Sequence, residues 1–138
     1  MRFFALTSVL AAATCALAQE AARYGAVSID GSNTVSAGQT FSVTYNSTAA
    51  RYTPKTVDFL LQGTMPNGDR SAYVVLARND FPADQDVLQQ DLTMPDVTAS
   101  LGSDITNWLL ISYITYNYDD YTPPVVMSGG TSTPINLA

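Results

Sequence analysis

Short stretches of alternating apolar and polar residues, separated by turn-forming clusters, constrain the fold of this chain more than any other sequence feature. The clearest stretch covers residues 40–46, where Phe41, Val43 and Tyr45 alternate with polar residues. Successive side chains of a strand point to opposite faces, so this pattern predicts a strand with one buried face and one solvated face. Similar stretches recur along the chain, and the expected strands are residues 25–30, 40–46, 56–62, 71–77, 87–94, 107–117 and 123–128.

About seven short strands at regular spacing, with no convincing helix between them, predict an all-β fold. The expected architecture is a single immunoglobulin-like or fibronectin III-like β-sandwich. Hydrophobic residues make up 46% of the chain, which is enough to build one core over residues 19–138 without disulfides. The residues expected to form that core are Phe41, Val43, Val57, Phe59, Leu61, Leu92, Trp108 and Leu110.

The first eighteen residues have the layout of a secretory signal peptide. Arg2 precedes an apolar run over residues 3–13, and the small residues Ala16 and Ala18 flank Leu17 before the expected cleavage site. The apolar run is too short to span a bilayer. We therefore expect a secreted, extracellular protein that begins at residue 19, has lost Cys15 with the signal peptide, and has no stable membrane anchor.

The charge and composition exclude several classes of function. The chain has 6 basic and 12 acidic residues, a formal net charge of −6, which disfavours nucleic acid and anionic membranes as partners. It has no histidine, and its one cysteine lies in the predicted signal peptide. The common nucleophile–base pairs and zinc sites therefore cannot be built. We expect a protein that is not an enzyme and uses no cofactor or metal, with an Asp-dependent hydrolase as the remaining enzymatic alternative.

Aromatic and acidic residues gather in three of the expected loops. Chain direction alternates between strands, so the loops after the second, fourth and sixth strands should emerge at one end of the sandwich. Exposed tyrosines there would give a large contact area at low entropic cost. The candidate binding residues are Tyr52, Phe81, Tyr118, Asp119, Asp120 and Tyr121. In the alternative interpretation, Tyr116 and Tyr118 continue the strand alternation toward the core and the aspartates only solvate turns.

Calcium binding is a second alternative for the same end of the sandwich. Ca²⁺ takes six to eight oxygen ligands. Carboxylates for such a site would come from Asp80, Asp84, Asp86, Asp119 and Asp120. The spacing of these residues matches no EF-hand loop, so the sequence does not favour a metal site.

One N-glycosylation sequon, Asn46-Ser47-Thr48, follows the clearest strand. A sugar on Asn46 would lie near the end where the candidate binding residues gather. An unused sequon at a strand end is the equally simple alternative.

Two segments carry a resemblance to known fungal proteins. Residues 35–43 contain a Val-x-x-Gly-x-x-Phe-x-Val pattern that is similar to the opening of fungal secreted Ig-like domains, and residues 55–63 follow as the next strand. In this order the segments resemble the NIS1-like family of necrosis-inducing secreted effectors. The resemblance implies a virulence-associated effector that binds host proteins such as immune-receptor kinases, and it supplies no catalytic residues.

Wall-associated Ig-like domains of fungi begin with a similar strand. This second resemblance implies a cell-wall structural protein or a protein that binds cell-wall carbohydrate. Together with the composition, these resemblances predict a secreted, non-enzymatic binding protein whose partner is a host protein or a cell-wall carbohydrate.

Overall fold

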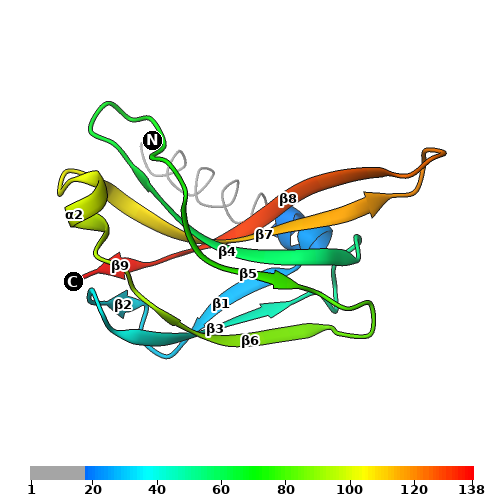
Figure 1. The fold of residues 1–138 in the computed structure, drawn as a ribbon, viewed down its shortest axis with the longest axis horizontal. Helices are drawn as coiled ribbons and strands as arrows, with labels where there is room; N and C mark the ends of the chain where they lie inside the picture. Colours follow the sequence, from blue (N-terminus) through cyan, green and yellow to red (C-terminus); the bar gives the residue numbers. More distant parts are fainter. Residues whose placement is uncertain (1–17) are drawn as a thin grey trace, which may run out of the picture.

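A computed structural model describes residues 18–138 of the chain (Figure 1). The predicted signal peptide, including Cys15, lies outside the described residues apart from its last position. No helix within residues 18–138 is long and apolar enough to cross a membrane.

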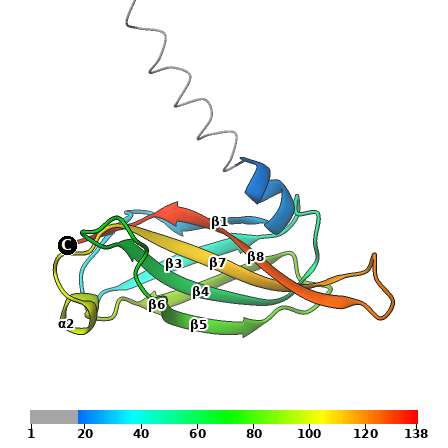
Figure 2. The same ribbon diagram turned by 90° about the horizontal axis from the view of Figure 1, so that it is seen from above.

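Two antiparallel sheets packed face to face form the molecule (Figures 1 and 2). The strands are β1 (Ala26–Asp30), β2 (Thr34–Val35), β3 (Thr40–Asn46), β4 (Pro54–Thr64), β5 (Val74–Asp80), β6 (Val87–Thr93), β7 (Thr106–Tyr118), β8 (Val125–Pro134) and β9 (Asn136–Leu137). One sheet has the order β1-β3-β6, the other has the order β5-β4-β7-β8, and β2 pairs with β9 in parallel. This arrangement confirms the predicted all-β sandwich of the immunoglobulin-like or fibronectin III-like kind.

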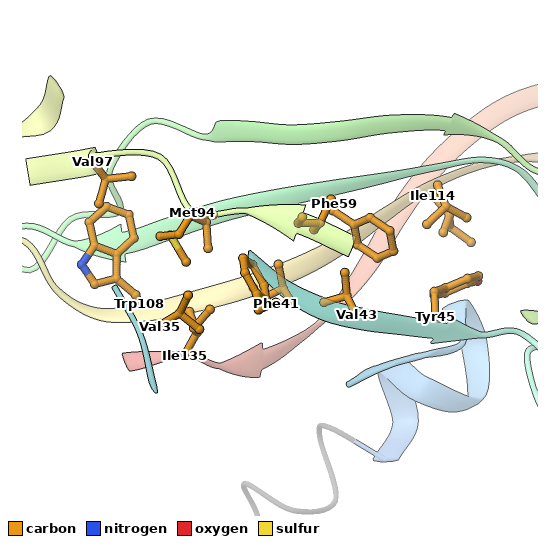
Figure 3. Packing of buried hydrophobic residues seen from close by; sticks show 14 of the residues in the cluster. Val35, Phe41, Val43, Tyr45, Phe59, Met94, Val97, Trp108, Ile114 and Ile135 are labelled. Carbon is orange, nitrogen blue, oxygen red and sulfur yellow. The ribbon is translucent and has the colours of Figure 1, made fainter. Parts of the chain in front are cut away.

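The core lies between the two sheets and contains all eight residues expected there. The expected alternation holds in β3, where Phe41, Val43 and Tyr45 are buried and the residues between them are not. One end of the core is closed by Val35 of β2, which lies near Ile135 and Trp108 (Figure 3). Trp108 is buried as well, so the structure places it in the core.

The prediction of no helix is wrong at two places. Residues 18–24 are helical, and α2 spans Val97–Leu101. Asp96 caps α2: its side chain accepts hydrogen bonds from the Ala99 amide at 3.0 Å and the Thr98 hydroxyl at 2.8 Å. These bonds hold the pKa of Asp96 below its usual value. Gly102 ends the helix with φ at 97°, a conformation that favours glycine.

Strand β5 begins and ends three residues later than residues 71–77, the range predicted for it. Ser71 belongs instead to the connection from β4, because its amide donates to the Gly63 carbonyl at 2.9 Å and its hydroxyl accepts from the Gly63 amide at 3.0 Å. Asp80 consequently lies within the strand, opposite Thr56, rather than in the loop that follows.

Strand β8 starts near its predicted position but continues well beyond residue 128. The predicted strand, residues 123–128, ended before Gly129 and Gly130. Here both glycines are needed inside the strand. A Cβ atom at Gly129 would lie 2.5 Å from the ring of Tyr24, and one at Gly130 would lie 2.5 Å from the Ser112 carbonyl oxygen. Close approach of neighbouring atoms is a known reason for glycine in a strand interior.

Candidate functional site

The three loops that carry the candidate binding residues meet at one end of the sandwich, as the alternation of chain direction predicts. We call this end the tip and define it by the loops over residues 47–53, 81–86 and 119–124. A hollow of about 570 Å³ opens there, lined by residues 51–55, Phe81, Ala83 and residues 117–120. Segments that are far apart in the sequence thus share one concave surface.

Stacked tyrosines form the wall between the tip and the core. The rings of Tyr52 and Tyr116 are 4.3 Å apart between centroids and tilted by only 14°. Tyr116 is 2% exposed, whereas Tyr52 is half-buried. Tyr24 lies against both, with centroid distances of 6.1 Å to Tyr52 and 6.0 Å to Tyr116. Offset aromatic pairs at these distances are attractive, so Tyr52 is the outer member of a stack that is rooted in the core.

The helical residues 18–24 dock onto the tip and were not expected there. The backbone amides of Arg51 and Tyr52 donate to the carbonyls of Ala22 at 2.9 Å and Arg23 at 3.2 Å. These bonds satisfy carbonyls that a helix end leaves without partners. The hydroxyl of buried Tyr45 donates to the Tyr24 carbonyl at 2.6 Å.

A sequence signal for this docked segment exists. The strong helix formers at residues 20–23 are followed by Gly25, which has φ at +88°. Glycine shortly after a helical stretch is a common stop signal. Arg23 and Tyr24 were not among the predicted binding residues, and they lie against the tip through this docked segment.

Two arginines lie over tyrosine rings at the tip. The guanidinium carbon of Arg51 is 5.4 Å from the centroid of Tyr52, and that of Arg23 is 5.4 Å from the centroid of Tyr24. These distances are within the range of cation–π attraction. The Tyr52 hydroxyl beside Arg23 raises the pKa of this guanidinium further, so its charge is permanent at any physiological pH.

The loop over residues 119–124 carries the acidic side of the tip. A hydrogen bond with Asp120 and the charge of its carboxylate raise the pKa of Tyr118 above its usual value. The Tyr118 ring lies edge-on to Tyr52 at 6.1 Å and is 5.7 Å from Tyr121. Asp119 and Asp120 are exposed, and Tyr121 is 59% exposed. The lining of the hollow thus includes the acidic residues Asp119 and Asp120 together with the basic residues Arg51 and Lys55.

Not every predicted binding residue is available for contact. Phe81 is 3% exposed and packs edge-on against Tyr45 at 5.6 Å, so it supports the floor of the hollow and is not an exposed contact residue. The alternative interpretation is correct for Tyr116, which is a core residue, and holds in part for Tyr118, which packs against the core. Tyr121 remains the most exposed aromatic residue of the tip.

The five aspartates considered for calcium do not gather at one point. Within residues 18–138, no group of three or more His, Cys, Asp or Glu side chains could hold a metal ion together. Asp80 lies within β5, whereas Asp119 and Asp120 are neighbours in the loop between β7 and β8. The acidic residues of this end are spread over the surface.

Asn46 lies at the last position of β3, on the same end of the molecule as the tip but outside the lining of the hollow. The residue is exposed, and its side-chain oxygen accepts a hydrogen bond from the Thr48 amide at 2.8 Å. Its glycosylation stays a prediction.

No family model and no curated protein matches the chain. Among solved structures, a DUF4785 family protein from Legionella pneumophila is similar to 80% of this chain, with a TM-score of 0.48 and 18% sequence identity. The matched region is 27% of that protein, so this chain spans less than a third of its length. This similarity assigns no ligand or activity to the chain.

Proposed function

We propose that this chain is a secreted, non-enzymatic binding protein that uses the tip to bind a partner protein. One observation carries the proposal: three loops and the helical residues 18–24 converge on a hollow with an aromatic wall and charges of both signs. The stack beneath Tyr52 holds this wall in place before a partner arrives, which lowers the entropic cost of binding. Tyrosine and arginine are also the residue types enriched at the energetic centres of protein interfaces.

The chemistry of the tip favours binding over catalysis. The pKa values of Tyr118 and Arg23 are both raised, so at neutral pH each is held further in its protonated form and can donate hydrogen bonds to a partner. The resemblance to necrosis-inducing effectors makes host immune-receptor kinases the first class of partner to test.

Affinity capture with a matched pair of variants tests the proposal. The bait is the secreted protein, and the prey is a membrane and extracellular extract of a candidate host, with a cell-wall glycan array in parallel. Tyr121→Ala removes an exposed ring of the loop over residues 119–124, which lies beside the hollow and 5.7 Å from Tyr118 of its lining. Tyr73→Ala is the control because Tyr73 is similarly exposed, at 53% against 59%, and belongs to none of the three loops of the tip. Neither change should alter the melting temperature by more than about 1–2 °C, because both side chains are largely in solvent.

The expected result is a protein that wild type and Tyr73→Ala retain and that Tyr121→Ala loses. Truncation of a central aromatic anchor costs about 2 kcal/mol or more of binding free energy. Equal retention by all three proteins would refute the tip as the binding site. Retention by glycans alone would replace the protein partner with a carbohydrate, and release of reducing sugar would overturn the non-enzymatic assignment.

A further inference from the structure

The hairpin of β7 and β8 projects beyond the rest of its sheet (Figures 1 and 2). The pairing of β7 with β4 ends at Tyr116, whereas its pairing with β8 continues through Asn117 and Tyr118. Within residues 18–138, β8 pairs with no other strand and is an edge of the four-stranded sheet. The backbone of its projecting part, before Gly129 and the Tyr24 ring that lies against it, therefore offers hydrogen-bonding groups to a further strand.

The projecting part of β8 is apolar and exposed on both faces. Val125 is 47% exposed, Val126 is 59% exposed and Met127 is 42% exposed. Successive residues of a strand face opposite sides, so neither side of the hairpin is covered here. An isolated two-stranded hairpin is at best marginally stable in water, so this segment gains from a third strand.

The two edges of the four-stranded sheet differ in how they are protected. Edge strands usually avoid pairing with other chains through charged side chains or bulges. Strand β5 has both devices: it carries Arg78 and Asp80, and its pairing with β4 shifts register between Phe59 and Leu60. Strand β8 has no charged residue in its ten positions. Of the two edges of the four-stranded sheet, the β8 edge is therefore the one that charged side chains do not protect.

From this contrast we propose that two copies of the chain associate by antiparallel pairing of their β8 strands, centred on Val126. This register places Val125 of each copy opposite Met127 of the other, on one face, and the two Val126 side chains opposite each other on the other face. Directly opposed apolar residues are the stabilising unit of a sheet. An uncharged strand pairs with itself without like-charge repulsion, although the chain as a whole has a net charge of −6. A two-fold axis repeats the same contacts in both copies.

Sedimentation velocity over a concentration series tests this inference on the secreted protein. Wild type should show a reversible monomer–dimer equilibrium. Val126→Lys places two lysines opposite each other and should weaken association by about tenfold or more. Val75→Lys is the matched control, because Val75 is 46% exposed on the other edge strand of the same sheet, and it should leave association unchanged.

A complementary variant makes the register testable. Val126→Asp should weaken association in the same way, and an equimolar mixture with Val126→Lys should restore the dimer through opposite charges across the axis. The inference is overturned if wild type stays monomeric up to millimolar concentration, if Val75→Lys weakens the dimer as much as Val126→Lys, or if the mixture fails to associate. Circular dichroism of each variant separates loss of pairing from loss of fold.

Discussion

At the scale of single residues, Tyr45 links the core to the tip. Its ring is fully buried between the sheets, and its hydroxyl holds the Tyr24 carbonyl at the end of the helical residues 18–24. The ring of Tyr24 then packs against Tyr52 and Tyr116. One buried hydroxyl thus helps to fix the aromatic wall of the binding surface.

Tyr45→Phe should destabilise the protein by about 1–3 kcal/mol, because the Tyr24 carbonyl loses a buried hydrogen-bond donor. Urea unfolding at pH 7, followed by circular dichroism, measures this difference. Tyr73→Phe is the control, since Tyr73 is largely exposed and should show no change. A Tyr45→Phe protein as stable as wild type would mean that water or another donor replaces the hydroxyl.

The same residue should make stability sensitive to alkali. Burial raises the pKa of Tyr45 above its usual value of about 10, because the folded protein disfavours the phenolate. Its contribution is therefore fully present below about pH 10 and is lost as the pH rises above that value, where only the unfolded chain ionises. Tyr45→Phe should lose less stability than wild type above this pH. If the unfolding free energies of the two proteins fall in parallel above this pH, the buried Tyr45 phenol is not the cause of the alkaline loss of stability.

At the scale of elements, a strand with one buried and one solvated face is predictable from sequence. Strand β3 begins and ends where it was predicted, because its alternation runs without interruption. The extension of β8 and the two helical segments were missed. Their causes are tertiary contacts, such as the approach of Tyr24 to Gly129, or short caps such as Asp96, and neither produces a periodic pattern.

The two glycines of β8 provide a test at this scale. A methyl group at Gly130 would meet the backbone of β7, which cannot move away, whereas one at Gly129 would meet the ring of Tyr24, a side chain that can shift at the cost of its contacts with Tyr52 and Tyr116. Overpacking costs about 1–3 kcal/mol, and Gly130→Ala should lie at the upper end of this range. Thermal unfolding of both variants measures which of the two loses more stability. A larger loss for Gly129→Ala would show that Tyr24 is held more rigidly than β7.

At the scale of the whole molecule, the residues that stabilise the fold and the residues proposed to bind a partner lie in different parts of the sandwich. The core lies between the sheets, and the loops at the tip are attached to its strands. The meeting of the three loops was predictable, because it depends only on alternating chain direction. It was not predictable which tyrosines remain exposed. Tyr116, Tyr118 and Tyr121 look alike in sequence, whereas their burial depends on where β4 stops pairing with β7.

Hydrogen–deuterium exchange of the protein, alone and with the partner that affinity capture yields, tests whether the tip is the binding surface. We expect protection in peptides that cover residues 18–24, 47–53, 81–86 and 119–124, with little change in β5 and β6. Protection confined to the outer face of the four-stranded sheet around Tyr73, with exchange at the tip unchanged, would contradict it.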